Sequence, residues 1–264
     1  MTNTAIVTGA SSGIGADIAR ELARRQWHVV LVARRADRLD ELATSLRAQY
    51  KVNTHVLPAD LTDETQRRDV IRLSAAWAEA QGHRLTALVN NAGTGVWNEF
   101  ADQDEHTLLR DIELNVTAVT SLTHAFTRLA LRQGGPAHVL NIASLAGLLP
   151  APRFAVYSAT KSYLISFTEV LAQELQGTAV SVTCACPGGV QTEFLALAGQ
   201  KQISNIGMMR PQEVARLVVN AMLARKVIYV PGLLNKLSAL ARHLPSAMRT
   251  RLVGKSMALT VSKA

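Results

Sequence analysis

Two hydrophobic patterns alternate along the chain. Short runs of apolar residues are followed, time after time, by longer segments in which apolar residues recur every three or four positions. The short runs predict buried strands of a parallel sheet, and the longer segments predict amphipathic helices. The predicted strands cover residues 5–8, 27–33, 54–57, 85–89, 138–143 and 179–186.

Helical segments separate these strands. Ile18, Leu22 and Ala23 share one helical face directly after the first strand, and further helices are predicted at residues 37–50, 63–80, 105–132 and from Tyr157 onward. Residues 193–210 have mixed polarity and predict a loop or a short helix. This alternation predicts the α/β fold class: a single-domain, doubly wound, Rossmann-like parallel sheet with helices on both faces. Its ligand is expected at the carboxyl ends of the strands.

A glycine-rich turn lies between the first strand and the first helix. Its spacing is G-x-x-x-G-x-G, and it contains Gly9, Ser11, Ser12, Gly13, Ile14 and Gly15. Glycines at such a turn let backbone amides approach a pyrophosphate at the positive end of the helix. A glycine turn alone is a weak signal, but this one follows a strand and opens a helix, as a dinucleotide site requires.

Two arginines end the second strand. In an NAD site an acidic residue at about this place receives the ribose 2′-hydroxyl, whereas an arginine accommodates a 2′-phosphate. Arg34 and Arg35 stand there, with no acidic residue between them and the strand, and so predict NADPH/NADP+ as the cofactor. The alternative is that one of the two only covers the surface of the sheet.

Tyr157 and Lys161 are four residues apart on a predicted helix, and Ser144 follows the fifth strand. The spacing places the phenol and the ammonium on one helix face. A free tyrosine has a pKa of about 10, so a nearby cation is needed to favour its phenolate at neutral pH. Lys161 is the candidate cation, and the Ser144 hydroxyl is a candidate to hold a carbonyl oxygen. Taken alone, a Y-x-x-x-K pair is common on solvated helix faces.

Asn115 interrupts the apolar face of the predicted helix 105–132. A buried asparagine is costly unless its amide is hydrogen-bonded. It is therefore interpreted either as a structural residue that distorts the helix or as part of a polar relay.

Composition narrows the class of protein. The 264 residues are 48% apolar and only 5% aromatic, which suits a large aliphatic core. No signal peptide, membrane span or linker is evident, so a cytoplasmic protein is expected. Cys184 and Cys186 lie two apart on one strand without further ligands nearby and are interpreted as small buried hydrophobes. The seven histidines show no metal-ligand spacing, so no metal is predicted. No nucleic-acid partner is predicted either.

Taken together, the motifs resemble those of the short-chain dehydrogenase/reductase family, in its single-domain group. The resemblance covers about residues 4–230 and rests on motifs in fixed order: T-G-x-x-x-G-I-G at 8–15, the pair Asp60 and Leu61, N-N-A-G at 90–93, Asn115, the set Ser144, Tyr157 and Lys161, and P-G-x-V-x-T at 187–192. It implies a Rossmann-like domain at residues 1–231 that binds the dinucleotide and carries the catalytic residues. Residues 232–264, which lie beyond the resemblance, are interpreted from their charge and leucine spacing as a basic amphipathic C-terminal extension of the same domain.

The resemblance also implies residue roles. Tyr157 would be the general acid/base, Lys161 would bind the nicotinamide ribose and lower the tyrosine pKa, Ser144 would orient the carbonyl, and Asn115 would hold a water in a proton relay. Asp60 would meet the adenine. The further cofactor contacts implied by these motifs are Leu61, Asn91, Ala92, Gly93, Pro187, Gly188, Val190 and Thr192.

The chain departs from the family pattern in two places. Many NADP-linked members have a basic residue just before the second glycine, where this chain has Ser12, so phosphate selectivity must come mainly from Arg34 and Arg35. Many tetrameric members end shortly after a last strand, whereas this chain continues beyond Gly232. A homo-oligomer is still expected, either a tetramer or a dimer through the helices that contain Asn115 and Tyr157.

The reaction expected from the resemblance is reversible reduction of a hydrophobic ketone or aldehyde with NADPH. The apolar residues next to the site in sequence are Val96, Leu145, Leu148, Leu149, Phe154, Phe194 and Leu195, and their alternative role is core packing. Two other functions stay open: reduction of 3-oxoacyl thioesters, and a non-catalytic NADPH-binding regulator.

The C-terminal extension carries the excess charge. Nine of the 28 basic residues follow Glu213, and none of the 20 acidic residues does. Leu233, Leu237, Leu240 and Leu244 recur at helical spacing among these charges. This pattern suits an amphipathic helix on anionic lipid, but such helices usually pack on their own domain. We therefore expect a lid over the substrate cleft or a subunit interface, with at most weak membrane-surface association.

Overall fold

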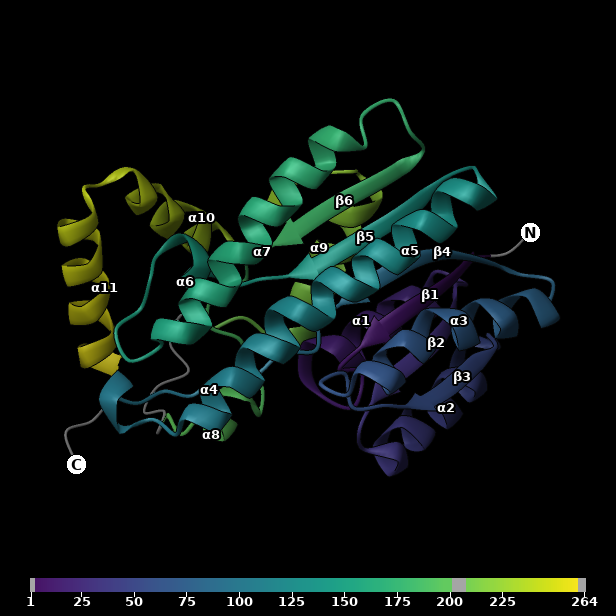
Figure 1. Cartoon of the computed structure of the whole chain (residues 1–264), viewed down its shortest axis with the longest axis horizontal. Coiled ribbons are helices and arrows are strands. Elements are labelled where there is room, and N and C mark those ends of the chain that lie inside the picture. The colour runs from purple at the N-terminus through teal and green to yellow at the C-terminus, as the bar shows by residue number, and fades with distance from the viewer. Residues whose placement is uncertain (1–2, 201–207, 261–264) are drawn as a thin grey trace.

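A twisted parallel sheet organises the molecule. The computed structural model describes residues 3–200 and 208–260, the last six by their backbone only. Within these residues seven parallel strands form one sheet in the order β3-β2-β1-β4-β5-β6-β7 (Figure 1). The strands are β1 Asn3–Thr8, β2 His28–Ala33, β3 Thr54–Pro58, β4 Arg84–Asn90, β5 Ala137–Ile142, β6 Val180–Ala185 and β7 Ile228–Tyr229. The predicted fold class and all six predicted strands are confirmed.

Helices cover both faces of the sheet because its strands are apolar on both faces. In β2, Val29 and Leu31 pack into one core layer, while Val30 and Val32 pack into the other. The first layer is completed by α1 Gly13–Arg24, α2 Ala36–Tyr50 and α9 Pro211–Leu223. The second contains α3 Glu64–Ala80, α5 Val119–Gln133 and α7 Ala155–Glu174, of which α5 and α7 lie in front of the sheet in Figure 1. The helix α4 Glu105–Ile112 contacts α7.

The predicted helix 105–132 is divided. Between α4 and α5, the segment Glu113–Ala118 is π-helical and contains Asn115. A π-helical turn contains one residue more than an α-helical turn, and such turns occur frequently at functional sites. The single uninterrupted helix expected from the sequence is therefore corrected, and the position of the interruption supports the interpretation of Asn115 as a residue that distorts the helix.

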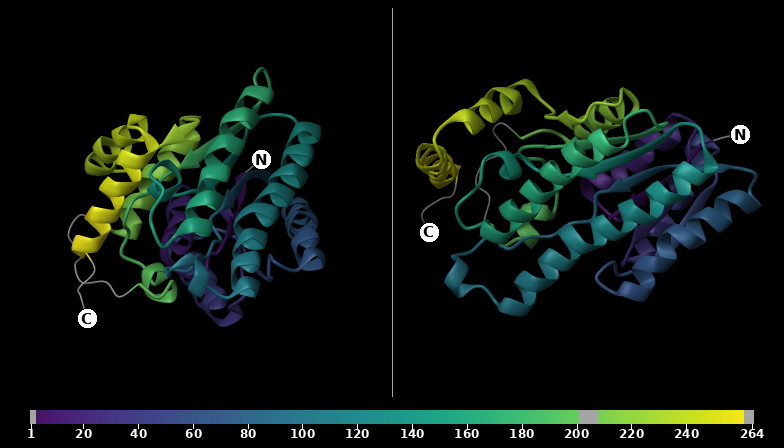
Figure 2. Two further views of the ribbon diagram at one scale, coloured as in Figure 1. Left: turned by 60° about the vertical axis from the view of Figure 1, so that its left-hand side comes forward. Right: turned by 45° about the horizontal axis from the view of Figure 1, so that its top comes forward.

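Short elements gather at the carboxyl ends of the strands. They are η1 Phe100–Asp102, α6 Leu145–Leu148, α8 Phe194–Leu197, α10 Leu233–Ala239, η3 Leu240–His243 and α11 Ser246–Thr260 (Figure 2). The predicted loop 193–210 begins with α8, and its residues 201–207 lie outside the described part of the chain. Because the strand order reverses between β1 and β4, this edge of the sheet opens into a crevice.

The C-terminal extension contacts the rest of the fold by its small residues, not by its leucines. Leu233 is 73% exposed, Leu237 57% and Leu240 63%, whereas Ala239 is buried against the core beside α7. The expectation that these leucines cover the cleft is wrong, because none of the three lines it, and the alternative that they meet a partner subunit stays a prediction. Helical spacing shows that the leucines share a face, but the packing of α10 turns the opposite face inward. Within the described residues, no helix is long and apolar enough to cross a membrane.

Candidate functional site

One large cavity collects the predicted site residues. It has a volume of about 910 Å³ and lies at the carboxyl ends of the strands. All the predicted catalytic and cofactor-binding residues line it except Gly15 and Asn115, which lie directly behind its wall. The lining set includes Gly9, Ser11, Ser12, Gly13, Ile14, Arg34, Arg35, Asp60, Leu61, Asn91, Ala92, Gly93, Ser144, Tyr157, Lys161, Pro187, Gly188, Val190 and Thr192.

The glycine turn has a conformation that side chains would prevent. Gly9 and Gly13 have φ values of +65° and +55°, in the left-handed region that favours glycine. A Cβ at Gly15 would lie 2.3 Å from Asn91 Nδ2 and 2.4 Å from the Gly9 carbonyl oxygen. Ser12 precedes α1 without capping it, because its hydroxyl accepts a hydrogen bond from Arg35 Nη2 at 2.8 Å. The turn and the free amino end of α1 therefore fit a phosphate group.

Thr8 and Asn91 tie this turn to the end of β4. The Thr8 hydroxyl accepts hydrogen bonds from the amides of Asn91 and Ala92 at 3.0 and 3.1 Å and donates to the Val89 carbonyl oxygen. The Asn91 side chain donates to the carbonyl oxygens of Thr8 and Gly9. The amide hydrogens of Asn91 are thus used to hold the turn in place, in addition to the cofactor contact expected of this residue.

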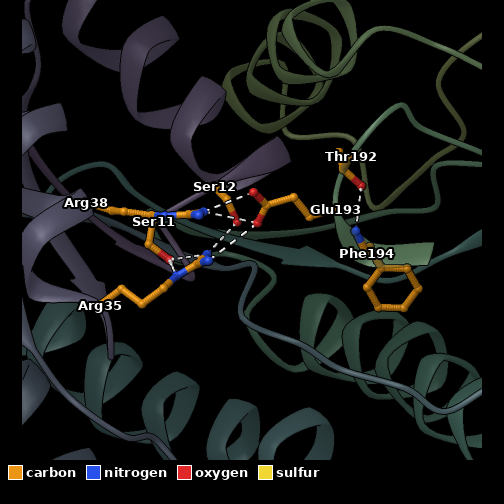
Figure 3. A network of polar contacts seen from close by, with 7 residues as sticks. All are labelled: Ser11, Ser12, Arg35, Arg38, Thr192, Glu193 and Phe194. Carbon is orange, nitrogen blue, oxygen red and sulfur yellow. Dashed lines mark hydrogen bonds and ion pairs between the residues drawn. The ribbon is translucent and has the colours of Figure 1, made fainter. Parts of the chain in front are cut away.

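Arg35 stands beside the glycine turn, as the sequence predicts. Its guanidinium donates to the hydroxyl of Ser11 at 2.9 and 3.2 Å as well as to Ser12. Two further residues complete this cluster, Arg38 and Glu193, which sequence analysis missed. The Glu193 carboxylate lies 3.0 Å from Arg38 and 3.4 Å from Arg35 (Figure 3). No motif marks either residue, because the contact joins positions 155 residues apart.

Asp60 is held by its neighbours at the carboxyl end of β3. It accepts hydrogen bonds from the amide and hydroxyl of Thr62 at 3.0 and 2.7 Å and forms an ion pair with Arg110 at 3.0 Å. Partial burial acts to raise the pKa of Asp60, but the Thr62 hydrogen bonds and the charges of Arg110 and Arg34 outweigh it, so this pKa is lowered. A charged Asp60 is therefore available on the cavity wall.

Ser144, Tyr157 and Lys161 come together from two elements. Ser144 precedes α6 and accepts a hydrogen bond from the Ala146 amide at 3.1 Å, and its hydroxyl also bonds the Tyr157 side chain. Lys161 is buried one helical turn after Tyr157 and donates to the Ile142 carbonyl oxygen at 2.9 Å. Its Nζ lies 5.6 Å from the centre of the Tyr157 ring. The predicted grouping of the three side chains is present.

The pKa of Tyr157 moves in the opposite direction to that expected. Burial raises it to about 12, against the hydrogen bond with Ser144 that lowers it. Burial also disfavours the charged form of Lys161, and it lowers the pKa of this residue to about 8. Helical spacing brings the ammonium near the phenol, but the loss of solvation outweighs that proximity here. In this structure Tyr157 is a neutral phenol at physiological pH, which is the form that donates a proton.

Asn115 is fully buried and fully engaged. Its Oδ1 accepts a hydrogen bond from the Thr94 amide at 3.1 Å, while its Nδ2 donates to the Thr94 carbonyl oxygen at 2.7 Å and to the Thr160 hydroxyl at 3.2 Å. A methyl group on Gly93 would lie 3.1 Å from Asn115 Oδ1 and 3.2 Å from Lys161 Nζ. The amide thus joins the π-helical segment to the strand-end loop and to α7, and its part in a proton relay stays a prediction.

Asp111 is a buried carboxyl group on the cavity wall that sequence analysis missed. It is 2% exposed, and its Oδ2 atom has no hydrogen-bond partner among the described residues. Burial raises the pKa of Asp111 to about 6, against hydrogen bonds from Thr94 and Val96 and the charge of Arg110. Asp111 lies on α4, one turn before Asn115 of the π-helical segment. The sequence gives no signal for it, because charged residues occur throughout α4.

Apolar side chains form the wall on the far side of Tyr157. The rings of Phe154 and Phe194 each lie 5.2 Å from the Tyr157 ring. Leu145, Leu149 and Leu195 also line the cavity, joined from other elements by Ala151, Leu197, Met208 and Val253. Val96 and Leu148, which were expected here, do not line it, and Leu148 is buried in the core beside α7.

The cysteines contribute no chemistry to the site. Cys184 and Cys186 are free, fully buried and packed in the core between β6 and α7, as predicted. Among the described residues, no three histidine, cysteine, aspartate or glutamate side chains gather as a metal site would require.

Comparison with known proteins identifies the family. The pattern of the family described as short chain dehydrogenase matches residues 3–203. The chain belongs to the short-chain dehydrogenase family. It is 36% identical to sulfoacetaldehyde reductase 2 of Chromohalobacter salexigens over 216 residues, 80% of this chain and 82% of that protein. Membership makes the protein an oxidoreductase, and the expectation drawn from the motifs is confirmed.

Two solved structures of the short-chain dehydrogenase family are similar along the chain. One is a short-chain dehydrogenase from Sphingobium yanoikuyae in complex with NADPH, with a TM-score of 0.81 and 31% identity over 99% of this chain and 97% of that one. The other is the bulky-bulky ketone specific alcohol dehydrogenase from Comamonas testosteroni, with a TM-score of 0.75 and 29% identity over 91% and 92%.

Proposed function

We propose that this protein is an NADPH-dependent reductase of hydrophobic ketones or aldehydes, acting reversibly. The observation that carries this assignment is the single cavity in which a phosphate-binding turn, a basic cluster and the Ser144, Tyr157 and Lys161 side chains meet an apolar wall. The similarity to a structure in complex with NADPH supports the choice of cofactor. The similarity to a ketone-specific alcohol dehydrogenase supports the substrate class.

The residues that line the cavity support the proposed cofactor. In this proposal the glycine turn would hold the pyrophosphate, Asp60 would meet the adenine and Arg35 the 2′-phosphate, and Val190 and Thr192 would meet the nicotinamide amide. Gly93 leaves Lys161 uncrowded, since a Cβ at this position would lie only 3.2 Å from Nζ. When bound, NADPH would supply the hydride that reduces the carbonyl carbon.

The chain's own residues supply the proton and the alignment. Tyr157, neutral below its pKa of about 12, donates its hydroxyl proton to the carbonyl oxygen as that oxygen becomes an alkoxide. Ser144, which already bonds the Tyr157 hydroxyl, holds the same oxygen in line. Lys161 places a positive charge next to the phenolate that remains after proton transfer. Oxidation of an alcohol runs through the same contacts in reverse.

The apolar wall favours a hydrophobic substrate. Sulfoacetaldehyde carries a sulfonate anion, and the Phe154 and Phe194 rings beside Tyr157 offer it no opposite charge. An aryl or alkyl ketone can bury its apolar surface against the same rings. We therefore assign ketones with apolar substituents to this cavity, in preference to the anionic aldehyde named for the similar reductase.

A substrate panel tests this assignment. Turnover is measured with NADPH and with NADH on aryl ketones, alkyl ketones, sulfoacetaldehyde and a 3-oxoacyl thioester. We expect the highest kcat/KM for a ketone with NADPH. Preference for the thioester would identify a 3-oxoacyl reductase, and tight NADPH binding without any turnover would identify a non-catalytic regulator.

We also infer that copies of the chain associate. Apolar residues are exposed on α4, α5 and α7, namely Leu109, Ile112, Leu131 and Val170. These helices include the pair through which a dimer is expected, and light scattering after size-exclusion chromatography measures the mass directly.

The division into residues 1–231 and the extension 232–264 is kept as part of the same proposal, because Ser238 and Val253 of the extension line the cavity. The cytoplasmic location and the weak membrane association stay predictions.

A further inference from the structure

Glu193 connects the basic cluster of the cavity to the loop that covers Tyr157. Its two carboxylate oxygens accept hydrogen bonds from Arg38 Nη1 at 3.0 and 3.1 Å, and one of them accepts from Arg35 Nη1 at 3.4 Å. The arginines come from the start of α2, and Glu193 comes from the loop after β6 (Figure 3). The carboxylate therefore joins two segments that are distant in the sequence.

The donors around Glu193 are those that a phosphate monoester would use. Arg35 is fixed at the glycine turn by the hydroxyls of Ser11 and Ser12, and its remaining Nη1 donor points to the carboxylate. A phosphate monoester at neutral pH carries up to two negative charges and offers three acceptor oxygens, so it satisfies the same guanidinium groups more completely than one carboxylate does.

This ion pair is weak enough to exchange. The side chains of Arg35, Arg38 and Glu193 are 40%, 41% and 49% exposed. Ion pairs with this exposure contribute little net stability, because water competes for both charges. An anion of higher charge can therefore replace the carboxylate at small cost.

The residues on either side of Glu193 belong to the catalytic side of the cavity. Thr192 accepts a hydrogen bond from the Phe194 amide at 3.4 Å, and the Phe194 ring packs on Tyr157. The Glu193 carbonyl oxygen accepts from the Leu197 amide at 3.0 Å and so begins α8. The carboxylate that contacts the arginines and the ring that contacts Tyr157 thus belong to adjacent residues.

We propose that Glu193 is a specificity-determining residue that competes with the 2′-phosphate of NADPH for Arg35 and Arg38. Glu193 has this role only if Arg35 receives the 2′-phosphate, as proposed above. NADH has no 2′-phosphate, so it leaves the ion pair in place. NADPH binding requires Glu193 to give up the two arginines. The residue therefore sets how strongly the chain prefers NADPH.

Direct binding measurements on Glu193→Gln test this competition. The amide keeps the size of the side chain and removes its charge. Without the competitor, the Kd for NADPH should fall about two- to fivefold, as expected for an exposed ion pair, and the Kd for NADH should not change. Adenosine 2′,5′-bisphosphate and adenosine 5′-monophosphate, titrated by calorimetry, should repeat the contrast without the nicotinamide.

Glu64→Gln is the matched control. Glu64 forms an exposed ion pair with Arg68 within α3, is itself 62% exposed and does not line the cavity. It should leave both Kd values unchanged. An unchanged NADPH Kd in Glu193→Gln would overturn the proposal, and so would weaker NADPH binding, since the carboxylate would then position the arginines instead of competing for them.

Variants of the arginines separate this proposal from the cofactor assignment. If Arg35→Ala together with Arg38→Ala removes the preference for NADPH while Glu193→Gln changes nothing, the cofactor assignment stands and the competition is refuted. If removing both arginines leaves the NADPH Kd unchanged, the cofactor assignment itself fails at these residues, and the role of Glu193 fails with it.

Discussion

Phe194 packs on Tyr157, with ring centres 5.2 Å apart and ring planes at 42°. The ring of Phe154, the residue directly before α7, also packs on Tyr157, with ring centres 5.2 Å apart. Tilted aromatic pairs at such distances are favourable and directional. The two contacts fix the orientation of the phenol and leave its hydroxyl beside Ser144, so the apolar wall of the cavity also positions the proton donor.

Tyr157→Phe should therefore abolish turnover while preserving the site. The substitution removes only the hydroxyl, and the ring keeps its contacts with Phe154 and Phe194. Losing a general acid typically costs about two to four orders of magnitude in rate, and the Kd for NADPH should stay within a few-fold. Steady-state kinetics and cofactor fluorescence measure the two quantities, and retention of most of the kcat would refute the proposed mechanism.

Lys161→Ala should damage both cofactor binding and turnover. The ammonium is buried, donates to the Ile142 carbonyl oxygen and lies near the Tyr157 ring. Removing it takes away a candidate ribose contact and the charge that stabilises the phenolate. Truncation also leaves a cavity, so Lys161→Met serves as a control that restores the volume. If Lys161→Met recovers both Kd and kcat, the role of Lys161 is packing and the charge is not needed.

The sequence predicted the elements that depend on local pattern. The strands follow from apolar runs, and the glycine turn follows from its place between β1 and α1. The cavity follows from these, because parallel strands bring their carboxyl ends to one edge. Thus Ser144 and Gly9, far apart in the chain, were expected on one wall, and both line it.

Features that depend on three-dimensional burial or on distant pairing were not predicted. The raised pKa of Tyr157 results from burial, which a Y-x-x-x-K spacing does not report. The contact of Glu193 with Arg38 joins distant positions that no periodicity relates. The leucines of α10 illustrate a third case, because their spacing defines a helix face without stating whether that face turns toward the core or toward solvent.

Replacing Arg34 and Arg35 with alanine should weaken NADPH binding selectively. Charge-assisted hydrogen bonds contribute about 1.5–3 kcal/mol each, and the partial exposure of Arg35 reduces this, so we expect about 2–4 kcal/mol in total. The Kd for NADH should be nearly unaffected, since its ribose lacks the phosphate. A wild-type protein that turns over NADH as well as NADPH would contradict the assignment before any variant is made.

Asp111→Asn should stabilise the protein at neutral pH more than at acidic pH. Burial raises the folded-state pKa of Asp111 to about 6 from its usual value of 3.8. A raised folded pKa means that the stabilising contribution is fully present below the unfolded pKa and is lost as pH rises through about 6. The amide removes this loss, which amounts to about 3 kcal/mol for a carboxyl group that is 2% exposed.

Urea unfolding at pH 4.5 and at pH 7.5 measures this difference. The gap in unfolding free energy between Asp111→Asn and the wild type should be larger at pH 7.5. An equal difference in unfolding free energy at both pH values would show that the carboxyl group is not the origin of the effect. Asp69→Asn, at an exposed ion pair on α3, should show little change at either pH.

The C-terminal extension should affect the affinity for substrate through one side of α11. Val253 lines the cavity, whereas its neighbour Leu252 is 51% exposed. Val253→Ala removes apolar surface equivalent to one or two methylene groups, each contributing about 0.8 kcal/mol, so KM for a hydrophobic ketone should rise roughly fivefold. Leu252→Ala is the matched control and should leave KM unchanged, because its side chain faces solvent.

Removing residues 246–264 extends the same test to the whole of α11. The truncated chain loses Val253 from the wall but keeps the glycine turn and Arg35, so KM should rise while the Kd for NADPH stays nearly constant. Sedimentation with anionic vesicles is measured in parallel, because the extension is strongly basic and exposes Leu233 and Leu237. If truncation leaves KM and the oligomeric mass unchanged and abolishes vesicle binding, the extension is a membrane-surface anchor and not part of the substrate wall.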